Sequence, residues 1–304
     1  MTKPYAKLSE SELPAYLAAK VRLIDETLDT WLPAESIDPV SIHKAMRYSL
    51  FAGGKRIRPI LAIAAARAVS DSPDGIENAA ATLELIHTYS LVHDDLPALD
   101  NDNLRRGRPT CHKAFGEAIA ILAGDSLLTL AFEMLGRLPI IDAGRKIRLV
   151  EELARASGTV GGMIAGQVND IEGERKPPTA FLLESIHRAK TGALLRASLR
   201  MGAIYAGATA EELAALSEFG EHVGLAFQII DDVLDVEESS ENLGKTAGKD
   251  AVQQKITFPA VYGLERSRQM AEEERLAAHT SLHSFDDRAN RLRQIADFIV
   301  QRKT

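Results

Sequence analysis

Apolar residues recur at spacings of three and four along almost the whole chain, which is the period of an α-helix. Alanine, leucine and glutamate dominate these stretches, and no stretch alternates convincingly with the period of two that a half-buried strand shows. Thr209 and Ser9 precede acidic first turns, as helix caps do. The pattern predicts an all-α protein of many helices.

Helix breaks are expected at glycine, proline and polar clusters. These lie at residues 53–54, 72–75, 106–109, 138–139, 176–178 and 237–249. None is long enough or biased enough to be a flexible interdomain linker, and no fixed-period repeat or low-complexity segment is present. We therefore expect a single domain over residues 1–304.

The predicted helix that ends at residues 231–235 is apolar nearly all round, so it is expected to be buried. At 100° per residue, Gln228, Asp231, Asp232 and Asp235 fall within an arc of about 100°. This stripe would face an internal cavity. The alternative is the solvated face of an ordinary helix, which the apolar flanking residues argue against.

A second acidic cluster, Asp-Asp-Leu-Pro-Ala-Leu-Asp at residues 94–100, follows a helix expected from about residue 78 to 95. On an unbroken helix Asp94 and Asp100 would lie about 240° apart, but a bulge at Pro97 can bring the second carboxylate back. His87, Ser90 and Asp94 share one face of the helix. A histidine there is often a core residue; nearby basic residues favour a functional role.

The two acidic clusters lie about 140 residues apart, without cysteine ligands or an adjacent pair of histidines. Buried carboxylates need a compensating cation. Oxygen ligands of this kind favour a hard ion, and Mg²⁺ that bridges carboxylates to phosphate oxygens is the common case. The clusters therefore predict a magnesium site.

Two basic runs complete the candidate site: Gly-Gly-Lys-Arg-Ile-Arg-Pro at residues 53–59 and Arg-Arg-Gly-Arg at 105–108. The glycine pair allows close backbone approach. A basic run alone is usually a solvated surface. Together with two acidic clusters, these side chains suit a diphosphate, whose charge one cation cannot neutralise.

Composition narrows the class of protein. The 304 residues are 45% hydrophobic with a net charge of −7, so a large core is possible and nucleic acid is an unsuitable partner. Cys111 is the only cysteine, which excludes an intrachain disulfide. The N-terminus does not resemble a signal peptide, and Asp125 splits the longest apolar run, well short of the roughly 18 residues of a membrane span. We expect a soluble, cytoplasmic protein without a membrane span.

At this point the motifs resemble a known family, the trans-isoprenyl diphosphate synthases. The resemblance rests on five motifs in this order, from about residue 40 onward: residues 53–59, Leu-Ile-His-Thr-Tyr-Ser-Leu-Val-His-Asp-Asp-Leu-Pro at 85–97, Arg-Arg-Gly at 105–107, Lys-Thr-Gly at 190–192, and Phe-Gln-Ile-Ile-Asp-Asp-Val-Leu-Asp at 227–235. Within the family, the chain is most similar to bacterial farnesyl diphosphate synthases (geranyltranstransferases).

The resemblance implies one polyprenyl synthetase domain, a single helical bundle around a central cavity (the isoprenoid synthase fold), with the two aspartate motifs facing each other across its mouth. It also implies a homodimer. The implied reaction is Mg²⁺-dependent head-to-tail transfer: dimethylallyl or geranyl diphosphate ionises to an allylic carbocation, which isopentenyl diphosphate attacks to give farnesyl diphosphate.

Residue roles also follow from the resemblance. Up to three Mg²⁺ ions would be held by Asp94, Asp95, Asp100, Asp231 and Asp235. The allylic diphosphate would be bound by Arg105, Lys190, Lys245 and Lys255. The diphosphate of isopentenyl diphosphate would be bound by Lys55, Arg58, His87 and Arg106. Thr191, Gln228 and the backbone near Lys190 would stabilise the carbocation, which makes Lys190, Thr191, Gln228 and Arg105 the candidate catalytic residues.

Product length depends on Tyr89 and Ser90, the fifth and fourth residues before Asp94. A bulky Tyr89 about 7.5 Å below Asp94 along the helix would block long prenyl tails. Helical angles place Tyr89 off the face that carries His87, so this role rests on the resemblance. Two alternatives stay open: Tyr89 is a core residue, or the chain is a geranyl or geranylgeranyl diphosphate synthase.

Some positions depart from the family pattern. Amides at Asn101 and Asn103 stand where many relatives carry aspartates, and Gln254 replaces the glycine that commonly precedes the lysine at 255. The basic end, Arg302 and Lys303, is a candidate for closing over the substrate, as tails do in this family.

Rival functions use fewer of these features. Glu84-x-x-His87 and Glu184-x-x-His187 match the ligand pairs of di-iron carboxylate bundles, but that function would leave both aspartate motifs and both basic runs without a role. A terpene cyclase typically carries an Asn/Ser/Glu motif in place of the second aspartate motif. A non-catalytic paralogue usually lacks aspartates that are present here.

Overall fold

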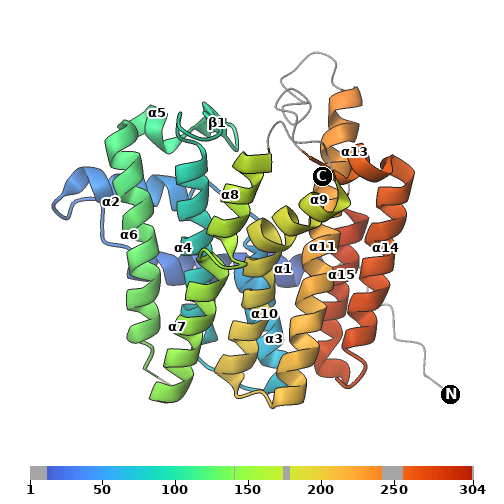
Figure 1. The fold of residues 1–304 in the computed structure, drawn as a ribbon. Helices are drawn as coiled ribbons and strands as arrows, with labels where there is room; N and C mark the ends of the chain where they lie inside the picture. The colour runs from blue at the N-terminus through green and yellow to red at the C-terminus, as the bar shows by residue number, and fades with distance from the viewer. Residues whose placement is uncertain (1–11, 140, 174–178, 242–255, 303–304) are drawn as a thin grey trace. The chain divides into compact units, whose positions relative to one another are not determined.

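The computed structural model describes residues 12–139, 141–173, 179–241 and 256–302, and most of these residues are helical (Figure 1). The expected all-α fold is confirmed. One feature that the pattern missed is a short hairpin, in which β1 (Leu104–Arg105) pairs with β2 (Arg108–Pro109). Arg106 and Gly107 both adopt positive φ in its two-residue turn, as tight hairpins require.

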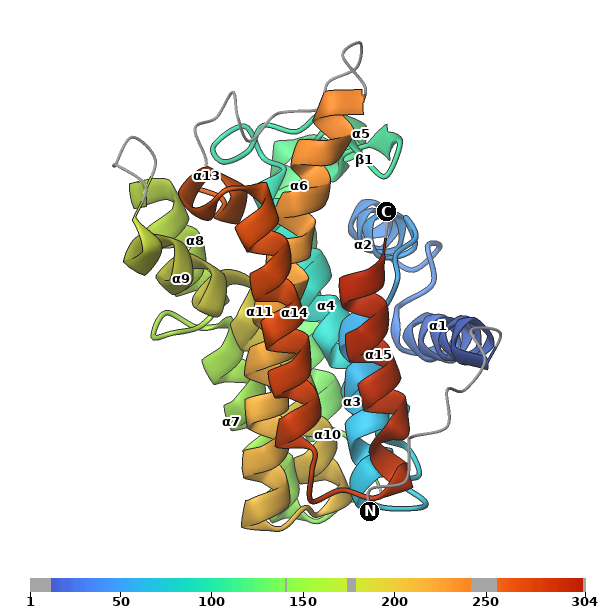
Figure 2. The ribbon, with the colours of Figure 1, turned by 90° about the vertical axis from the view of Figure 1, so that its right-hand side faces the viewer.

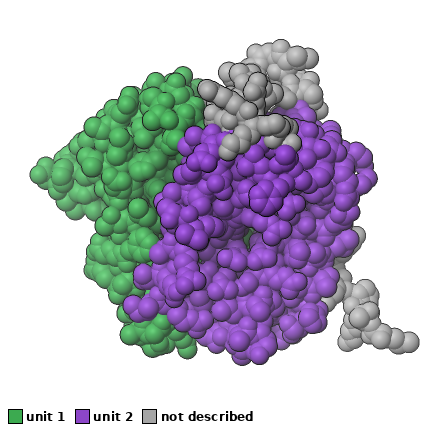
Figure 3. Space-filling view, viewed as in Figure 1, with its two compact units in different colours: residues 1–63, 74–146 green, residues 64–73, 147–304 purple. Residues whose placement is uncertain are grey.

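The chain divides into two compact units, which Figure 3 shows in different colours. Unit 1 comprises Met1–Ile63 and Asp74–Lys146, and unit 2 comprises Ala64–Pro73 and Ile147–Thr304. The expectation of a single domain over residues 1–304 stays a prediction, and each unit is described by itself.

Unit 1 is built around α4. The helices that lie in it wholly or in part are α1 (Glu12–Trp31), α2 (Val40–Leu50), α3 (Ile57–Val69), α4 (Ile76–Asp94), α5 (Cys111–Phe115), α6 (Glu117–Gly136) and α7 (Ala143–Ser157). α4 is buried on most of its circumference and packs against α1, α2 and α6. Its bounds agree with the predicted helix to within two residues. α4 thus carries the first acidic motif at the end of a rigid core helix.

A buried ion-pair network joins α4 to the loop after α2. Arg56 donates hydrogen bonds to Glu84 (2.8 Å), to Asp25 (2.9 Å) and to the carbonyl oxygen of Leu50 (2.7 Å). The side chains of Arg56 and Glu84 are 1% and 3% exposed. Burial by itself would lower the pKa of Arg56, but the charges and hydrogen bonds of Glu84 and Asp25 raise it. The network holds the glycine-rich basic loop against α4.

By length and composition alone, α6 could cross a membrane, although it contains Asp125. In unit 1 it packs against α4, α2 and α5, and Ala123, Leu127, Ala131 and Met134 are buried along it. Core helices of other proteins pass the same criteria of length and composition, and 39% of the apolar window of α6 is buried.

Unit 2 is organised by α11. It contains α8 (Met163–Gly173), α9 (Ala180–His187), the π-helix η1 (Arg188–Gly192), α10 (Ala193–Ala206), α11 (Ala210–Glu241), α13 (Phe258–Tyr262), α14 (Leu264–Ser281), η2 (Asp287–Ala289) and α15 (Asn290–Gln301). α11 packs against α10, α14 and α15, and it lies beside α14 in both Figures 1 and 2. The prediction that this helix ends at residues 231–235 is wrong. Since no glycine or proline follows the aspartates directly, the helix continues to Glu241 and the motif lies within it.

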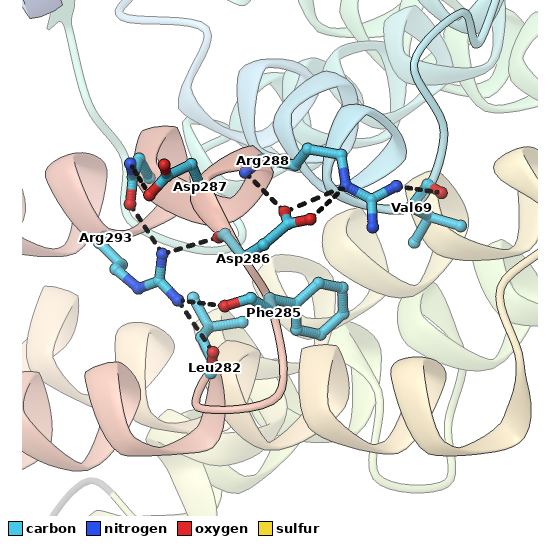
Figure 4. A network of polar contacts seen from close by, with 8 residues as sticks. Val69, Leu282, Phe285, Asp286, Asp287, Arg288 and Arg293 are labelled. Carbon is cyan, nitrogen blue, oxygen red and sulfur yellow. Dashed lines mark hydrogen bonds and ion pairs between the residues drawn. The ribbon is translucent and has the colours of Figure 1, made fainter. Parts of the chain in front are cut away.

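The connection from α14 to α15 is held by buried Arg293 (Figure 4). Its guanidinium donates to the carbonyl oxygens of Leu282 and Phe285, both at 2.9 Å, and of Asp286 at 3.1 Å. Arg288 donates to the carbonyl oxygen of Val69 (3.3 Å), which ties this connection to the end of α3 within unit 2. These bonds fix the backbone of the connection between the two helices.

Glu84→Gln should lower the free energy of unfolding by about 3 kcal/mol, because it leaves the buried Arg56 charge without its main partner. Glu133→Gln is the matched control, since Glu133 pairs with Arg137 on an exposed surface, and it should change stability by less than about 1 kcal/mol. Urea denaturation measures both. Equal effects of the two substitutions would contradict a stabilising role for the buried pair.

Candidate active site

The first acidic motif folds back on itself after α4 ends. The Asp100 N–H donates to the carbonyl oxygen of Asp94 (2.8 Å), and the Asp102 N–H donates to that of Asp95 (3.1 Å). Pro97 lies in the turn between them, so the predicted return of the chain at this proline is observed in the backbone. Asp94 and Asp100 are both half-buried at the end of α4.

Asp95 binds Arg105 in a bidentate ion pair. Nη2 and Nε of Arg105 lie 2.6 and 2.9 Å from Oδ1 of Asp95, whose side chain is buried. Burial by itself would lower the pKa of Arg105, but the hydrogen bonds and charge of Asp95 raise it. The structure therefore joins two residues that the resemblance gave separate roles, and in this state Asp95 orients Arg105 on the hairpin.

His87 lies among four arginines of unit 1. Burial lowers the pKa of His87 well below its usual range, and the charges of Arg58, Arg106, Arg105 and Arg56 lower it further. His87 is therefore neutral at pH 7. Of the residues predicted to bind isopentenyl diphosphate, the structure brings together Arg58, His87 and Arg106. Lys55 is exposed in the loop just before α3, the helix that carries Arg58.

The close approach of Arg106 depends on Gly54. A Cβ atom at this glycine would lie 2.8 Å from Nη1 of Arg106. Burial lowers the pKa of Arg106. The charge of Glu84 raises this pKa, and the charges of Arg56 and Arg105 lower it further. Arginines whose charges act on one another favour an anionic ligand, and guanidinium groups match phosphate geometry.

Tyr89 lies on a different side of α4 from His87. Its buried ring packs edge-to-face on His93, with the ring centroids 5.8 Å apart. Nε2 of His93 lies 3.0 Å from the carbonyl oxygen of Ile121 on α6, where Gly124 leaves room for the imidazole. Burial and the charge of Asp94 raise the pKa of Tyr89 to about 12. This placement supports the alternative that Tyr89 is a core residue.

Ser90, the second predicted chain-length residue, is half-buried on α4. Its hydroxyl donates to the carbonyl oxygen of His87 at 2.8 Å. This local bond turns the hydroxyl toward the backbone of its own helix.

In unit 2, the predicted metal ligand Asp231 forms an ion pair with Arg302, next to the end of the described chain. Arg302 also donates to the carbonyl oxygen of Phe227 (3.1 Å), and its guanidinium lies 4.2 Å from the centroid of the Phe227 ring. Arg302 thus supplies positive charge at Asp231 in this structure. Asp235, one turn further along α11, is half-buried.

Lys190 and Thr191 lie in η1, a π-helical turn between α9 and α10. Such turns are frequent at functional sites. Nζ of Lys190 lies 2.6 Å from Oδ2 of Asp170 on α8, and the Thr191 hydroxyl donates to Oε1 of Gln228 at 2.9 Å. The structure thus brings together Thr191 and Gln228. Asp170 was not predicted from the sequence, because its pairing with Lys190 spans two helices and leaves no local signal.

Asp232 has a different environment from its neighbours in the motif. It is buried, and its carboxylate accepts hydrogen bonds from Nε2 of Gln228 (2.8 Å) and from the backbone N–H of Phe258 (2.9 Å). Nε2 of His187 lies 3.7 Å from its Oδ2. Burial lowers the pKa of His187 to about 4, so this histidine is neutral and does not balance the carboxylate charge.

The carboxylates fit Mg²⁺ by their chemistry. Within the described ranges, no three acidic, histidine or cysteine side chains are grouped as a metal centre. Mg²⁺ commonly takes one or two carboxylates together with substrate phosphates. Asp94, Asp100, Asp231 and Asp235 carry carboxylates of this kind, and in this structure Asp95 is paired with Arg105 and Asp231 with Arg302. The two motifs belong to different units, and Lys245 and Lys255 lie outside the described residues.

Two cavities lie within single units. The larger, of about 340 Å³, is in unit 2 and is lined by residues that include His187, Gly192, Arg196 and Glu274. A smaller cavity in unit 1, of about 30 Å³, is lined in part by Asp95, Arg105 and Arg106. The smaller one borders predicted substrate-binding residues. The central cavity that the resemblance implies stays a prediction.

Comparisons with known proteins identify the class. The chain is 46% identical over 302 residues to the chloroplastic heterodimeric geranylgeranyl pyrophosphate synthase large subunit 1 of Arabidopsis thaliana, covering 97% of this chain and 81% of the relative. It is 47% identical over 283 residues to geranylgeranyl pyrophosphate synthase 12 of the same plant, covering 90% and 77%. An apo crystal structure of an FPP/GFPP synthase from Zymomonas mobilis matches with a TM-score of 0.86 and 35% identity, covering 96% and 100%.

The fold is therefore the all-α fold of the isoprenoid synthases. The polyprenyl synthetase family model matches residues 39–296, and the chain belongs to this family of prenyltransferases. The resemblance stated from the motifs is confirmed at the level of the family. The narrower resemblance to bacterial farnesyl diphosphate synthases is not confirmed.

Gly166→Ala should destabilise the protein by about 1–3 kcal/mol, because a Cβ atom there would lie 2.2 Å from the backbone nitrogen of Lys190. Gly136→Ala is the control, since a Cβ atom at that helical glycine meets nothing within 4 Å, and it should be neutral or slightly stabilising. Thermal unfolding of both variants measures this. A harmless Gly166→Ala would mean that α8 and η1 do not pack this closely.

His187 should make stability pH-dependent. The folded pKa of about 4 lies below the ordinary 6.5, so the unfolded chain binds a proton that the folded chain does not. Stability should fall as the pH drops from 6.5 toward 4, by on the order of 3 kcal/mol from this residue. His187→Gln should lose less stability than the wild type between pH 7 and pH 4.5 in urea titrations. Equal losses of stability in the wild type and in His187→Gln would contradict the burial of a neutral His187 imidazole.

Proposed function

We propose that the protein is a prenyl diphosphate synthase that extends an allylic diphosphate with isopentenyl diphosphate. The observation that carries the proposal is the arginine cluster around neutral His87, since it concentrates positive charge beside an acidic motif. An anionic ligand with several oxygens would balance that charge. Membership of the polyprenyl synthetase family makes a prenyl diphosphate the fitting ligand.

The proposed division of labour follows the two units. In unit 1, Lys55, Arg58, His87 and Arg106 would bind the diphosphate of isopentenyl diphosphate. Arg105, held by Asp95, would bind the allylic diphosphate together with Lys190, and with Lys245 and Lys255 from outside the described residues. Asp94, Asp100, Asp231 and Asp235, with Asp95 as a further candidate, would hold Mg²⁺. Bound Mg²⁺ would supply Lewis-acid stabilisation of the departing diphosphate.

The protein's own part is mainly positioning and electrostatics. Fixed cations hold the two diphosphates, so that the double bond of isopentenyl diphosphate meets the allylic carbon in a productive geometry. Oxygen dipoles of Thr191 and Gln228 would stabilise the allylic carbocation. Loss of a proton, to the departed diphosphate, completes the reaction, so no nucleophilic serine or cysteine is required.

Two product lengths are candidates. The names of the plant relatives favour geranylgeranyl diphosphate, the alternative stated from the sequence, over farnesyl diphosphate. Farnesyl diphosphate is the second candidate, because Tyr89 is a bulky buried residue just before the acidic motif and a structural neighbour is named an FPP/GFPP synthase. The contact of Tyr89 with His93 favours the longer product, since it places the ring away from the His87 face.

We also propose a homodimer. Ile121 and Leu122 are 44% and 52% exposed on α6, which supports a partner surface there. A plant relative is named as a subunit of a heterodimer, so pairing with a different chain is the alternative. The cytoplasmic location stays a prediction.

Incubation with Mg²⁺, isopentenyl diphosphate and dimethylallyl, geranyl or farnesyl diphosphate should give longer prenyl diphosphates, identified by mass after dephosphorylation. EDTA should abolish turnover, and Asp94→Asn should lower it by at least about a hundredfold if this carboxylate holds Mg²⁺. Asp71→Asn, at an exposed site on unit 2, is the control and should retain activity. A folded wild type that gives no product in any mixture would refute the proposed function.

Tyr89 can be tested by product length. If the ring limits the prenyl tail, the wild type makes a C15 product and Tyr89→Ala makes C20 or longer, whereas Tyr89→Phe, which keeps the ring, makes C15. If Tyr89 is a core residue, the wild type makes C20 and neither substitution changes it. A C20 wild-type product combined with longer products from Tyr89→Ala would contradict the core assignment.

A further inference from the structure

We propose that Asp232 is a positioning residue: its buried carboxylate fixes the orientation of the Gln228 amide and, through that amide, the direction of the Thr191 hydroxyl. The inference deepens the proposed function and rests on it, because Thr191 and Gln228 are placed there next to the allylic carbocation. Three residues of unit 2 form the relay, and the two hydrogen bonds that join them lie within that unit.

Asp232 is 6% exposed, and its carboxylate accepts two hydrogen bonds. A buried carboxylate without such donors would be strongly unfavourable. Oδ2 accepts a hydrogen bond from the backbone N–H of Phe258 at 2.9 Å, and Oδ1 accepts one from Nε2 of Gln228 at 2.8 Å. Both oxygens of Asp232 thus accept hydrogen bonds from N–H donors of unit 2, whereas the resemblance assigns Asp231 and Asp235 to metal binding.

This contact settles which way the Gln228 amide faces. A carboxylate only accepts hydrogen bonds, so Gln228 must present its NH₂ group to Asp232. Its Oε1 then points to Thr191, and the two oxygens lie 2.9 Å apart. Since an amide oxygen only accepts, the Thr191 hydroxyl must donate its proton to Gln228. The lone pairs of the Thr191 oxygen are thereby turned away from Gln228, where they can face a developing positive charge.

His187 does not replace Asp232 in this role. Its imidazole is stacked on the Phe258 ring, with centroids 5.2 Å apart, and its Nε2 lies 3.7 Å from Asp232, beyond hydrogen-bond distance. The polarity of the relay therefore originates at the Asp232 carboxylate. The simpler role for Asp232, an anchor for the start of α13 through Phe258, predicts an effect on stability and none on the direction of the Thr191 proton.

Asp232→Asn separates these roles. The Phe258 N–H cannot reverse, so the asparagine oxygen stays with it and the asparagine NH₂ faces Gln228. The Gln228 amide must then turn over, its NH₂ group faces Thr191, and Thr191 becomes the acceptor. We expect kcat to fall roughly tenfold to a hundredfold, while KM for both diphosphates changes less than about threefold.

The double variant Asp232→Asn with Gln228→Glu provides the rescue. The introduced glutamate carboxylate accepts from the asparagine NH₂ and from the Thr191 hydroxyl, which restores the original polarity with the same total charge. We expect it to recover most of the lost kcat. Gln228→Glu alone places two carboxylates against each other and should stay slow. Gln228→Met breaks the relay without touching the Phe258 anchor, and it should lower kcat like Asp232→Asn even if the latter fails to fold.

The outcomes are distinguishable. Circular dichroism and thermal unfolding establish that each variant is folded. An inactive, folded wild type would refute the proposed function itself. An active wild type with unchanged kcat in Asp232→Asn or in Gln228→Met would overturn the inference. A folded double variant no faster than Asp232→Asn would also overturn it. The double variant restores the direction of the hydrogen bonds, so an unchanged kcat would mean that this direction does not affect the reaction.

Discussion

Charges buried inside the helical units must meet fixed partners, and this constraint positions most residues of the candidate site. Arg56 is held by Glu84 and Asp25, and it anchors the basic loop to α4. Asp95 in turn holds Arg105 on the hairpin. A lone buried charge would cost several kcal/mol, so each pair fixes the backbone around it as well as the side chains. Two of the guanidinium groups near His87, those of Arg56 and Arg105, are thereby arranged before any ligand binds.

In unit 2 the same constraint acts on carboxylates. Lys190 is paired with Asp170, and Asp231 with Arg302. Asp232 instead satisfies its oxygens with N–H groups of Gln228 and Phe258. Adjacent aspartates in one motif therefore have different environments, because successive residues on a helix point about 100° apart. A binding role for one of them does not carry over to the next.

Much of this could be predicted from the sequence. Helical periodicity predicted the all-α fold and the bounds of α4, and the five motifs predicted the polyprenyl synthetase family. The turn at Pro97 followed from proline chemistry. The sequence did not show that α11 continues beyond the second aspartate motif, since helical periodicity alone does not mark where a helix stops. It did not show the pairing of Lys190 with Asp170 either, since contacts between helices leave no local pattern. Product length was the least predictable. The role of the Tyr89 side chain depends on which side of α4 faces α6, and the sequence does not show this.

The most direct test of a preformed diphosphate site is the titration of His87, followed by NMR of its imidazole and assigned with His87→Asn. Because desolvation and the charges of the nearby arginines both lower it, the pKa of His87 should lie well below 6.5 in the free protein. Saturating isopentenyl diphosphate should raise the pKa of His87, because the bound anion offsets the arginine charges. A pKa that is near 6.5 in the free protein, or unchanged by the ligand, would contradict a diphosphate site at these arginines.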